Sequence, residues 1–273
     1  MMNRVGLTDE EFRELRDFIY ENSGIYITDT KKYLVENRLQ RRLKEKKLGS
    51  FSDYVYLIKY AGNGTELSEL MNAITTNETY FFREPQHFDI IISKVLPAFI
   101  EQGRKRIRIW SAACSTGEEP YTMAILLREK RFPGVRFEIY GSDICNNALE
   151  SARKGVYSSY SVRNLPQNLL KKYFTEEKGF YHLNDEIKTT VRFMKINLVS
   201  KEEMKAIRNM DIILCRNVLI YFDEKAKKVA VSGLYDSLTP EGVLIVGASE
   251  TLHNVTRAFK PEVYNRTVIY RRA

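Results

Sequence analysis

The first 75 residues of the chain carry apolar side chains at helical spacing. An apolar face recurs every three or four residues from Phe12 to Ile19, just after Thr8 and Glu11, whose spacing is that of a capping box. Gly24 then suits the end of this helix. The same spacing recurs in two later windows, at Val35, Leu39 and Leu43 and at Leu67, Leu70, Met71 and Ile74. Residues 1–75 are therefore predicted to form an all-helical N-terminal domain, followed by a linker over residues 76–90.

The pattern changes after about residue 86, where short apolar runs alternate with helical windows. Strands are expected at residues 107–113, 135–140, 211–215 and 242–247, and helices at residues 87–100, 120–130, 146–153 and 224–238. Several strands are continuous apolar runs, which is typical of a parallel sheet covered by helices on both faces. Residues 91–273 are therefore predicted to form an α/β domain, with the short strand at residues 267–270 on a sheet edge.

The stretch between residues 155 and 197 interrupts this alternation. Residues 165–174 are predicted to be helical, and residues 179–183 and 189–193 to be two short strands joined by Asn184 and Asp185. We expect these strands to pair in a small antiparallel β-subdomain, inserted at about residues 175–195.

Composition limits the location and the chemistry of the protein. The 273 residues are 44% hydrophobic and 29% charged, which is ordinary for a soluble globular protein. No apolar run approaches the ~20 residues of a membrane span, and the amino terminus lacks the apolar stretch of a secretory signal. The three cysteines lie far apart without a C-x-x-C pair, so neither a zinc site nor a disulfide framework is expected. We therefore expect a cytoplasmic protein without membrane insertion and without a metal.

Positive charge is concentrated in one window of the helical region. Residues 31–48 contain eight basic and two acidic residues, so this window holds most of the net charge of +8. Such a helix predicts a negatively charged partner, which is an acidic protein surface, nucleic acid or anionic lipid. The alternative is a solvated charged face without a partner.

The turn after the strand at residues 107–113 indicates a cationic ligand. In doubly wound folds, ligands bind beyond the carboxyl ends of the strands. Here small residues lead to a helix that starts with Glu118 and Glu119 and has Pro120 at its first position. These carboxylates would repel a pyrophosphate, and Gly117 alone makes no dinucleotide fingerprint, whereas the sulfonium and ammonium groups of S-adenosylmethionine suit the turn. The alternative is that both glutamates only stabilise the helix N-terminus.

Further polar groups follow other predicted strands. Asp143 ends the next strand, where an acid commonly accepts hydrogen bonds from ribose hydroxyls, although a turn or cap residue is the common alternative. Polar residues stand beside aromatic ones at residues 75–83 and 215–222, as an adenine and substrate pocket requires. Under the alternative interpretation the aromatics belong to the core and the polar residues are caps.

Four co-linear motifs resemble one family of proteins. They are Thr76-Asn77-x-Thr79-x-Phe81-Phe82-Arg83, Trp110-Ser111-Ala112-Ala113-x-Ser115-Thr116-Gly117-Glu118-Glu119-Pro120-Tyr121, Ser142-Asp143-Ile144, and Cys215-Arg216-Asn217-Val218-x-Ile220-Tyr221-Phe222. The chain resembles the chemotaxis receptor methyltransferase (CheR) family through these motifs, and residues 37–43 resemble its N-terminal domain. The resemblance implies a Rossmann-like S-adenosylmethionine methyltransferase domain with an inserted antiparallel β-subdomain, preceded by an all-helical N-terminal domain.

The resemblance also implies roles for individual residues. Cofactor contacts are implied for Asn77, Thr79, Arg83, Glu119, Asp143, Asn197, Leu198, Arg216 and Asn217. Among them, Glu119 would hold the methionine part, Asp143 the ribose, and residues 197–198 the adenine. Arg83 and Tyr221 would be catalytic, with Tyr221 near the transferred methyl. On the basic helix, the acidic methylation helices of the receptor would contact Arg38, Arg41, Arg42 and Lys44.

The implied reaction is methyl transfer from S-adenosylmethionine to glutamate side chains of chemoreceptors, in chemotaxis adaptation, with S-adenosylhomocysteine as product. A glutamate carboxylate is already ionised near neutral pH, because its ordinary pKa is ~4.3, so no strong general base is needed. The alternatives are a non-catalytic S-adenosylmethionine-binding module and a nucleic-acid methyltransferase. Against nucleic acid, the chain lacks an Asn/Asp-Pro-Pro-aromatic motif and a Pro-Cys site. The short connection at residues 175–179 lacks a glycine-rich extension and argues against binding of a C-terminal receptor peptide as a tether.

Overall fold

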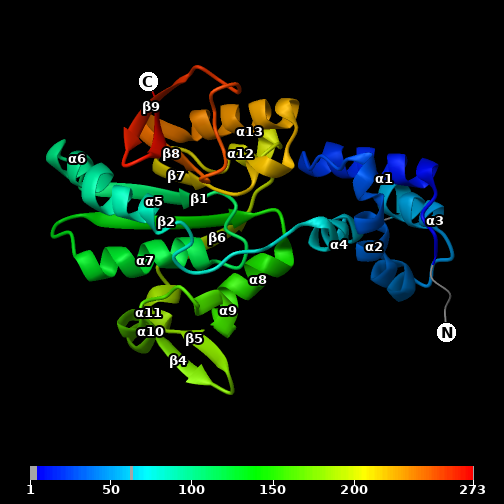
Figure 1. The fold of residues 1–273 in the computed structure, drawn as a ribbon, viewed down its shortest axis with the longest axis horizontal. Coiled ribbons are helices and arrows are strands. Elements are labelled where there is room, and N and C mark those ends of the chain that lie inside the picture. Colours follow the sequence, from blue (N-terminus) through cyan, green and yellow to red (C-terminus); the bar gives the residue numbers. More distant parts are fainter. Residues whose placement is uncertain (1–4, 62–63, 273) are drawn as a thin grey trace. The chain divides into compact units, whose positions relative to one another are not determined.

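The computed structural model describes residues 5–61 and 64–272, which form two compact units (Figure 1). The first unit holds the described residues up to Thr76 and also the segment Tyr221–Ala226. The second holds Asn77–Ile220 and Lys227–Ala273, except for its undescribed last residue. The chain therefore returns briefly to the first unit near its carboxyl end.

The first unit is built from short helices, as the apolar spacing predicts. Its elements are α1 (Asp9–Ser23), the 3₁₀ turn η1 (Asp29–Lys31), α2 (Lys32–Lys46), α3 (Phe51–Tyr56), the π-helical turn η2 (Leu57–Ala61) and α4 (Thr65–Ile74). The capping box is confirmed, because the Glu11 amide donates to Thr8 Oγ1 and the Thr8 amide donates to the Glu11 carboxylate. Gly24 ends α1 with φ +73°, a conformation that glycine adopts at little cost. On the predicted faces, Leu15, Leu39 and Leu70 are fully buried, whereas Phe18 and Leu67 are half-buried.

The second unit contains a seven-stranded sheet in the order β6-β2-β1-β7-β8-β10-β9. The strands are β1 (Arg106–Ser111), β2 (Arg136–Asp143), β6 (Val191–Lys195), β7 (Met210–Cys215), β8 (Leu238–Val246), β9 (Phe259–Tyr264) and β10 (Thr267–Arg272). The five neighbouring strands β6, β2, β1, β7 and β8 are parallel to one another. Strand β10 pairs antiparallel with β8, and β9 pairs antiparallel with β10. The predicted α/β class with a parallel sheet is therefore confirmed.

Helices cover this sheet, and Figure 1 shows α7 and α13 on opposite sides of it. Apart from three short helices beside the small sheet described next, the helical elements that follow Thr76 are α5 (Pro85–Ile90), the π-helical turn η3 (Ile91–Val95), α6 (Leu96–Glu101), α7 (Glu118–Lys130), α8 (Asn146–Lys154), α12 (Lys201–Met204), the 3₁₀ turn η4 (Leu219–Tyr221) and α13 (Glu224–Ser237). One core joins β1, β7 and β8 to α5, η3, α6 and α7, with Ile109, Ile125 and Ile212 fully buried in it. This core fixes the strand ends on which the candidate site is built.

A separate three-stranded antiparallel sheet interrupts the α/β order, as expected, but its strands differ from the prediction. It has the order β3-β5-β4, formed by β3 (Val156–Tyr157), β4 (Phe174–Glu177) and β5 (Phe180–Leu183), with the short helices α9 (Ser159–Val162), α10 (Gln167–Tyr173) and α11 (Asp185–Lys188) around it. The predicted pairing of residues 179–183 with residues 189–193 is wrong. The second of these segments is β6, which pairs in parallel with β2 in the large sheet, while β5 pairs with β4 through the two-residue turn Lys178–Gly179.

Two smaller predictions are also corrected. The strand at residues 267–270 is not a sheet edge, because β10 lies between β8 and the unpredicted edge strand β9. Asn265 and Arg266 join β9 to β10 with φ values of +45° and +68°, as a tight two-residue hairpin turn requires. Pro120 is not the first residue of its helix, because α7 begins at Glu118 with Gly117 as its N-cap.

Within the described part of the chain, no helix is both long and apolar enough to cross a membrane.

Candidate active site

The ends of three neighbouring strands form the candidate site. Strand β1 pairs in parallel with both β2 and β7, so the carboxyl ends of all three strands lie at one edge of the sheet. The segments that leave these strands begin at Ala112, Ile144 and Arg216. This edge is where ligands bind in open α/β sheets, and it brings together the predicted motifs from three separate parts of the sequence.

The turn after β1 is closely packed against the next strand. The Ser115 amide donates to Asp143 Oδ2 over 2.8 Å, and the Cys114 amide donates to the Ser142 carbonyl over 2.9 Å. Gly117 has a φ of +93°, and a Cβ there would lie 2.9 Å from the Ala152 side chain. Glycine is therefore required at this position by both the backbone conformation and the space available.

Asp143, at the end of β2, is almost fully buried, with 8% of its surface exposed. Its Oδ2 accepts from the Ser115 amide, and its Oδ1 accepts from the Cys145 amide over 2.9 Å. Burial raises the pKa of Asp143, and the backbone hydrogen bonds oppose that shift. Asp143 therefore forms a turn, as in the alternative interpretation of its place after the strand. Each of its carboxylate oxygens also keeps a lone pair that can accept a hydrogen bond from a ribose hydroxyl.

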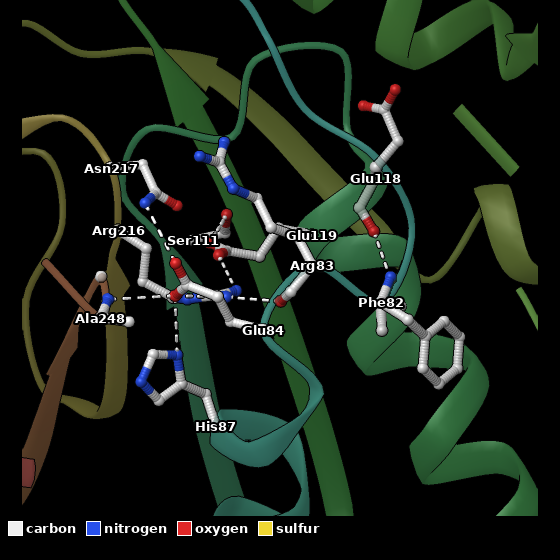
Figure 2. A network of polar contacts seen from close by, with 12 residues as sticks. Phe82, Arg83, Glu84, His87, Ser111, Glu118, Glu119, Arg216, Asn217 and Ala248 are labelled. Atoms are coloured by element: carbon white, nitrogen blue, oxygen red, sulfur yellow. Dashed lines mark hydrogen bonds and ion pairs between the residues drawn. The ribbon is translucent and has the colours of Figure 1, made fainter. Parts of the chain in front are cut away.

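Glu118 and Glu119 are adjacent in sequence but have different surroundings, and Figure 2 shows their side chains pointing apart. The Glu118 side chain accepts from Thr116 Oγ1 over 2.7 Å and is only 1% exposed. Burial raises its pKa. Glu119 instead accepts from Ser111 Oγ over 2.6 Å and from Arg216 Nη1 over 2.8 Å. Only Glu119 therefore belongs to the polar network at the ends of β1 and β7.

Arg216 is the centre of this network (Figure 2). Its side chain is 2% exposed and bridges Glu119 Oε2 to Glu84 Oε2, which lies 3.0 Å from Nη2. Its guanidinium also donates to the Arg83 carbonyl and lies 5.2 Å from the centre of the Phe88 ring. A buried arginine between two carboxylates is electrostatically compensated, because unpaired buried charges are strongly unfavourable.

Two carboxylates of this edge were missed by the sequence analysis, Glu84 and Glu250. Glu84 contacts Arg216 and Asn217, and Glu250 accepts from the Asn217 amide over 2.8 Å and the Gly247 amide over 2.6 Å. Glu84 directly follows the Arg83 motif, which was the only available signal for it. Neither glutamate stands out in sequence, because its partners after β7 lie more than 30 residues away along the chain, Arg216 and Asn217 for Glu84 and Asn217 for Glu250.

The segment that precedes α5 also reaches this edge of the sheet. The Asn77 carbonyl accepts from Ser115 Oγ over 3.1 Å, and Asn77 Nδ2 lies 3.3 Å from Cys145 Sγ. Arg83 is half-buried and donates to the Glu78 carbonyl over 2.9 Å. Thr79 is half-buried within the same segment. The structure thus places Asn77 beside the turns that follow β1 and β2.

One aromatic residue of this segment belongs to the core, as the alternative interpretation holds. Phe81 is fully buried and makes edge-to-face contacts with Tyr157 and Phe174, at ring-centre distances of 4.8 Å and 5.2 Å. These contacts anchor the segment to β3 and β4, so the small sheet supports the site from its side.

The remaining predicted cofactor residues also follow strands of the large sheet. Asn197 and Leu198 come directly after β6, the neighbour of β2, and the Ile196 amide donates to the Asp143 carbonyl over 3.2 Å. Leu198 is buried, and Asn197 Oδ1 accepts from the Val199 amide. Asn217 follows β7 with a φ of +57°. Tyr221 belongs to the helical unit, and its place near the transferred methyl stays a prediction.

The basic helix α2 has two kinds of basic residues. Arg42 pairs with the buried Glu66 over 2.7 Å, and Arg38 donates to the Ile74 carbonyl and to Thr76 Oγ1. Both therefore hold parts of the helical unit together. Arg41 and Lys44 are exposed, although Arg41 also pairs with Glu45 on the same helix. The exposed charge on this helix is smaller than the sequence suggests, because several cations have intramolecular partners.

The donor set of the site fits S-adenosylmethionine. The zwitterionic end of that cofactor needs an acceptor for its ammonium and a donor for its carboxylate, and Glu119 and Arg216 lie side by side. Asp143 supplies acceptors at the end of β2, where a ribose is expected. Among the described residues, no group of three or more histidines, cysteines or acids is placed to hold a metal ion.

A parallel sheet with Asp143 at the end of β2 and Glu119 at the start of the helix that follows β1 is that of a Rossmann-like S-adenosylmethionine-dependent methyltransferase. Two family profiles match the chain, the CheR methyltransferase all-alpha domain over residues 10–75 and the CheR methyltransferase SAM binding domain over residues 77–268. The chain therefore belongs to the CheR methyltransferase family. The resemblance and the cofactor inferred from sequence are confirmed.

Curated relatives agree over nearly the whole chain. The chain is 38% identical to "Chemotaxis protein methyltransferase 2" of Vibrio cholerae, over 98% of this chain and 95% of the relative. It is 36% identical to "Chemotaxis protein methyltransferase" of Borreliella burgdorferi, over 91% and 90% of the two chains. The protein of that name from Salmonella typhimurium is 37% identical over 95% and 90%.

Proposed function

We propose that this enzyme transfers the methyl group of S-adenosylmethionine to glutamate side chains of chemoreceptors, forming methyl esters for chemotaxis adaptation. The names of the relatives support the chemotactic role. The observation that carries the chemistry is the acidic edge of the sheet, where Glu119 and Asp143 suit a cationic cofactor. Such a role places the protein in the cytoplasm, where the signalling parts of chemoreceptors lie.

Carboxyl methylation explains why a strong base is unnecessary at this site. S-adenosylmethionine supplies an activated methyl group when it is bound. The glutamate nucleophile is ionised near neutral pH, so the protein has to orient the carboxylate and exclude water. Orientation of this kind is worth several kcal/mol, and up to roughly 7–11 kcal/mol in favourable intramolecular reactions.

Individual roles follow from the motifs and the contacts. Glu119 and Arg216 would hold the methionine part of the cofactor, Asp143 the ribose, and Asn197 and Leu198 the adenine. Asn77, Thr79 and Asn217 would complete the cofactor pocket. Arg83 and Tyr221 would orient the substrate carboxylate and would be the catalytic residues.

The basic helix α2 supplies the proposed contact with the acidic methylation helices of the receptor. Arg41 and Lys44 are exposed there and carry this proposal, whereas Arg38 and Arg42 contribute mainly by holding the helix in place. The two-residue turn Lys178–Gly179 has no extension beside β4, which supports the absence of a tether contact.

The decisive experiment is transfer of labelled methyl from S-adenosylmethionine to an unmethylated cytoplasmic receptor fragment, followed by release with alkali. We expect base-labile label in the fragment, because methyl esters hydrolyse to methanol under these conditions. A matched fragment with its candidate glutamates changed to alanine serves as control. Equal labelling of both fragments, or labelling of DNA or RNA instead, would contradict the proposal. Cofactor binding without any transfer would indicate a binding module.

A further inference from the structure

Arg163 lies between two aromatic rings, close to the proposed catalytic Arg83. It follows the short helix α9, and its guanidinium carbon lies 3.6 Å from the ring centres of both Tyr80 and Tyr160. The guanidinium carbon of Arg83 lies 5.7 Å from the centre of the same Tyr80 ring. All four residues belong to the second compact unit. The two arginines are therefore neighbours in the folded chain, although they are far apart in sequence.

Backbone and side-chain contacts hold this arrangement in place. The Phe81 amide donates to the Ser161 carbonyl over 2.9 Å and joins the two segments that carry the arginines. Tyr160 Oη donates to the Glu78 carboxylate over 2.9 Å, and the Glu78 carbonyl accepts from Arg83 Nη1 over 2.9 Å. The hydrogen bond to Glu78 raises the pKa of Tyr160, so the tyrosine stays protonated and keeps donating.

The positive charge of Arg163 is exposed and has no carboxylate partner in the part of the chain that the structure describes. Its Nη1 donates to the Tyr160 carbonyl over 2.6 Å, and further N–H donors remain for a ligand. The exposed Arg128, by contrast, pairs with Glu186. Glu78 is the acid of this cluster, but among the described residues it forms no ion pair with Arg163.

Stacking fixes the plane of the Arg163 guanidinium without neutralising its charge. Aromatic faces attract cations, and the flat guanidinium stacks on them well. A side chain that is already held loses little conformational freedom when it binds, and its fork of donors matches both oxygens of a carboxylate. Arg163 is therefore suited to bind a carboxylate from another molecule.

The proposed reaction brings such a carboxylate to this place. The acceptor is an acidic protein segment, and Arg83 is expected to contact the glutamate that is methylated. Arg163 adds a second positive charge beside Arg83, and complementary charges of this kind select a partner and fix its register. A second acidic residue of the same acceptor fits Arg163.

We propose that Arg163, held between Tyr80 and Tyr160, binds a second acidic residue of the acceptor, close to the glutamate that is methylated. Arg163 is then a substrate-binding residue that favours glutamates with an acidic neighbour and takes no part in methyl transfer itself. This inference rests on the proposed function and narrows the class of acceptor.

The first test is steady-state methylation of a cytoplasmic receptor fragment by the full chain and by variants at position 163. Arg163→Ala should raise the KM for the fragment about fivefold and leave kcat and the affinity for S-adenosylmethionine within about twofold, because the lost contact is away from the reacting atoms. Arg163→Lys keeps the charge but not the fork of donors, so it should recover only part of the loss. Arg128→Ala, which also removes one exposed positive charge of this unit, is the control and should leave the KM unchanged.

The second test changes the acidic residues that flank the methylated glutamate of the fragment to alanine, one at a time. With the parent chain, one of these changes should raise the KM about as much as Arg163→Ala does. With the Arg163→Ala enzyme, the same change should have little further effect, because the two groups interact.

Three results would overturn the role of Arg163. They are an unchanged KM in Arg163→Ala, a lowered kcat with unchanged KM, and changes in the fragment that affect both enzymes equally at every position. A parent chain that methylates no glutamate of the fragment would instead contradict the proposed function.

Discussion

At the scale of single residues, the site is organised around buried charges that compensate one another. Arg216 lies between Glu84 and Glu119, and Asp143 is held by backbone amides. Arg83 is different, because its side chain is only half-buried and makes one hydrogen bond, to the carbonyl of Glu78. A partly exposed arginine at the edge of an otherwise compensated site is suited to contact a substrate carboxylate.

Replacement of Arg83 by alanine should reduce methyl transfer more than cofactor binding. We expect turnover to fall on the order of a hundredfold and the affinity for S-adenosylhomocysteine to change less than about threefold, because the lost contact is made with the acceptor. Single-turnover transfer and calorimetry measure the two quantities. Arg128→Ala, which removes an exposed arginine paired with Glu186, is the control and should leave both unchanged. An unaltered rate in Arg83→Ala would refute its assignment.

Site residues were predictable from sequence where they belong to a motif. They were not predictable where only a contact in the folded chain identifies them. Glu119, Asp143, Arg216 and Asn217 were all singled out from sequence, and the structure brings them to one edge of the sheet. Glu250 was not, because an isolated glutamate that binds backbone amides resembles any surface glutamate in sequence.

At the scale of elements, α2 and α4 are joined by a buried ion pair that the basic run alone did not suggest. Glu66 is 3% exposed, and its carboxylate contacts Arg42, Lys46 and Tyr54. Burial opposes its ionisation, but these three partners lower the pKa of Glu66. The positive charge of α2 therefore has a structural use within the helical unit as well as the proposed receptor contact.

Glu66→Ala should destabilise the helical unit by roughly 1.5–3 kcal/mol, because the largely buried Arg42 would lose its two hydrogen bonds to Glu66 and keep only the more exposed Glu45 and Glu69 as ion-pair partners. Denaturant unfolding followed by circular dichroism measures this loss. Glu45→Ala, which removes a more exposed partner of the same helix, should cost less than about 1 kcal/mol. Equal losses of stability in the two variants would show that the buried ion pair stabilises the unit no more than the exposed one does.

The ion pair between Arg42 and Glu66 also predicts how the stability of the helical unit changes with pH. The pKa of Glu66 is lower in the folded state than its unfolded value of ~4.3, so its stabilisation is complete above that value. It is lost as the pH falls through the lower folded pKa. The stability of Glu66→Ala should therefore depend less on pH below about 4 than that of the parent chain.

At the scale of the whole molecule, the chain visits the helical unit twice. Tyr221–Ala226 groups with the N-terminal helices, where the Tyr26 amide donates to the Tyr221 carbonyl over 2.8 Å and Tyr20 Oη donates to Asp223 over 3.0 Å. The proposed catalytic Tyr221 therefore depends on partners from the N-terminal region for its local structure.

Removal of residues 1–76 should abolish receptor methylation while cofactor binding persists, because the proposed cofactor contacts all lie in the second unit. Hydrogen exchange at Tyr221–Ala226 should become faster, since its partners Tyr20 and Tyr26 are lost. Exchange and calorimetry on the shortened chain test both statements. Full methylation by that chain, or unchanged exchange in the segment, would contradict the dependence.

The sequence by itself determined the local features of this protein. Capping at Thr8, the helix end at Gly24, the helical windows and the alternation of strands and helices depend on interactions within a few residues and on which side chains avoid water. The motifs also identified the family and its cofactor. Only the tertiary structure decided that β6 joins the large sheet, that β9 forms its edge, and that Glu84 meets Arg216. Each of these depends on contacts between segments far apart in the chain, which local preference does not encode.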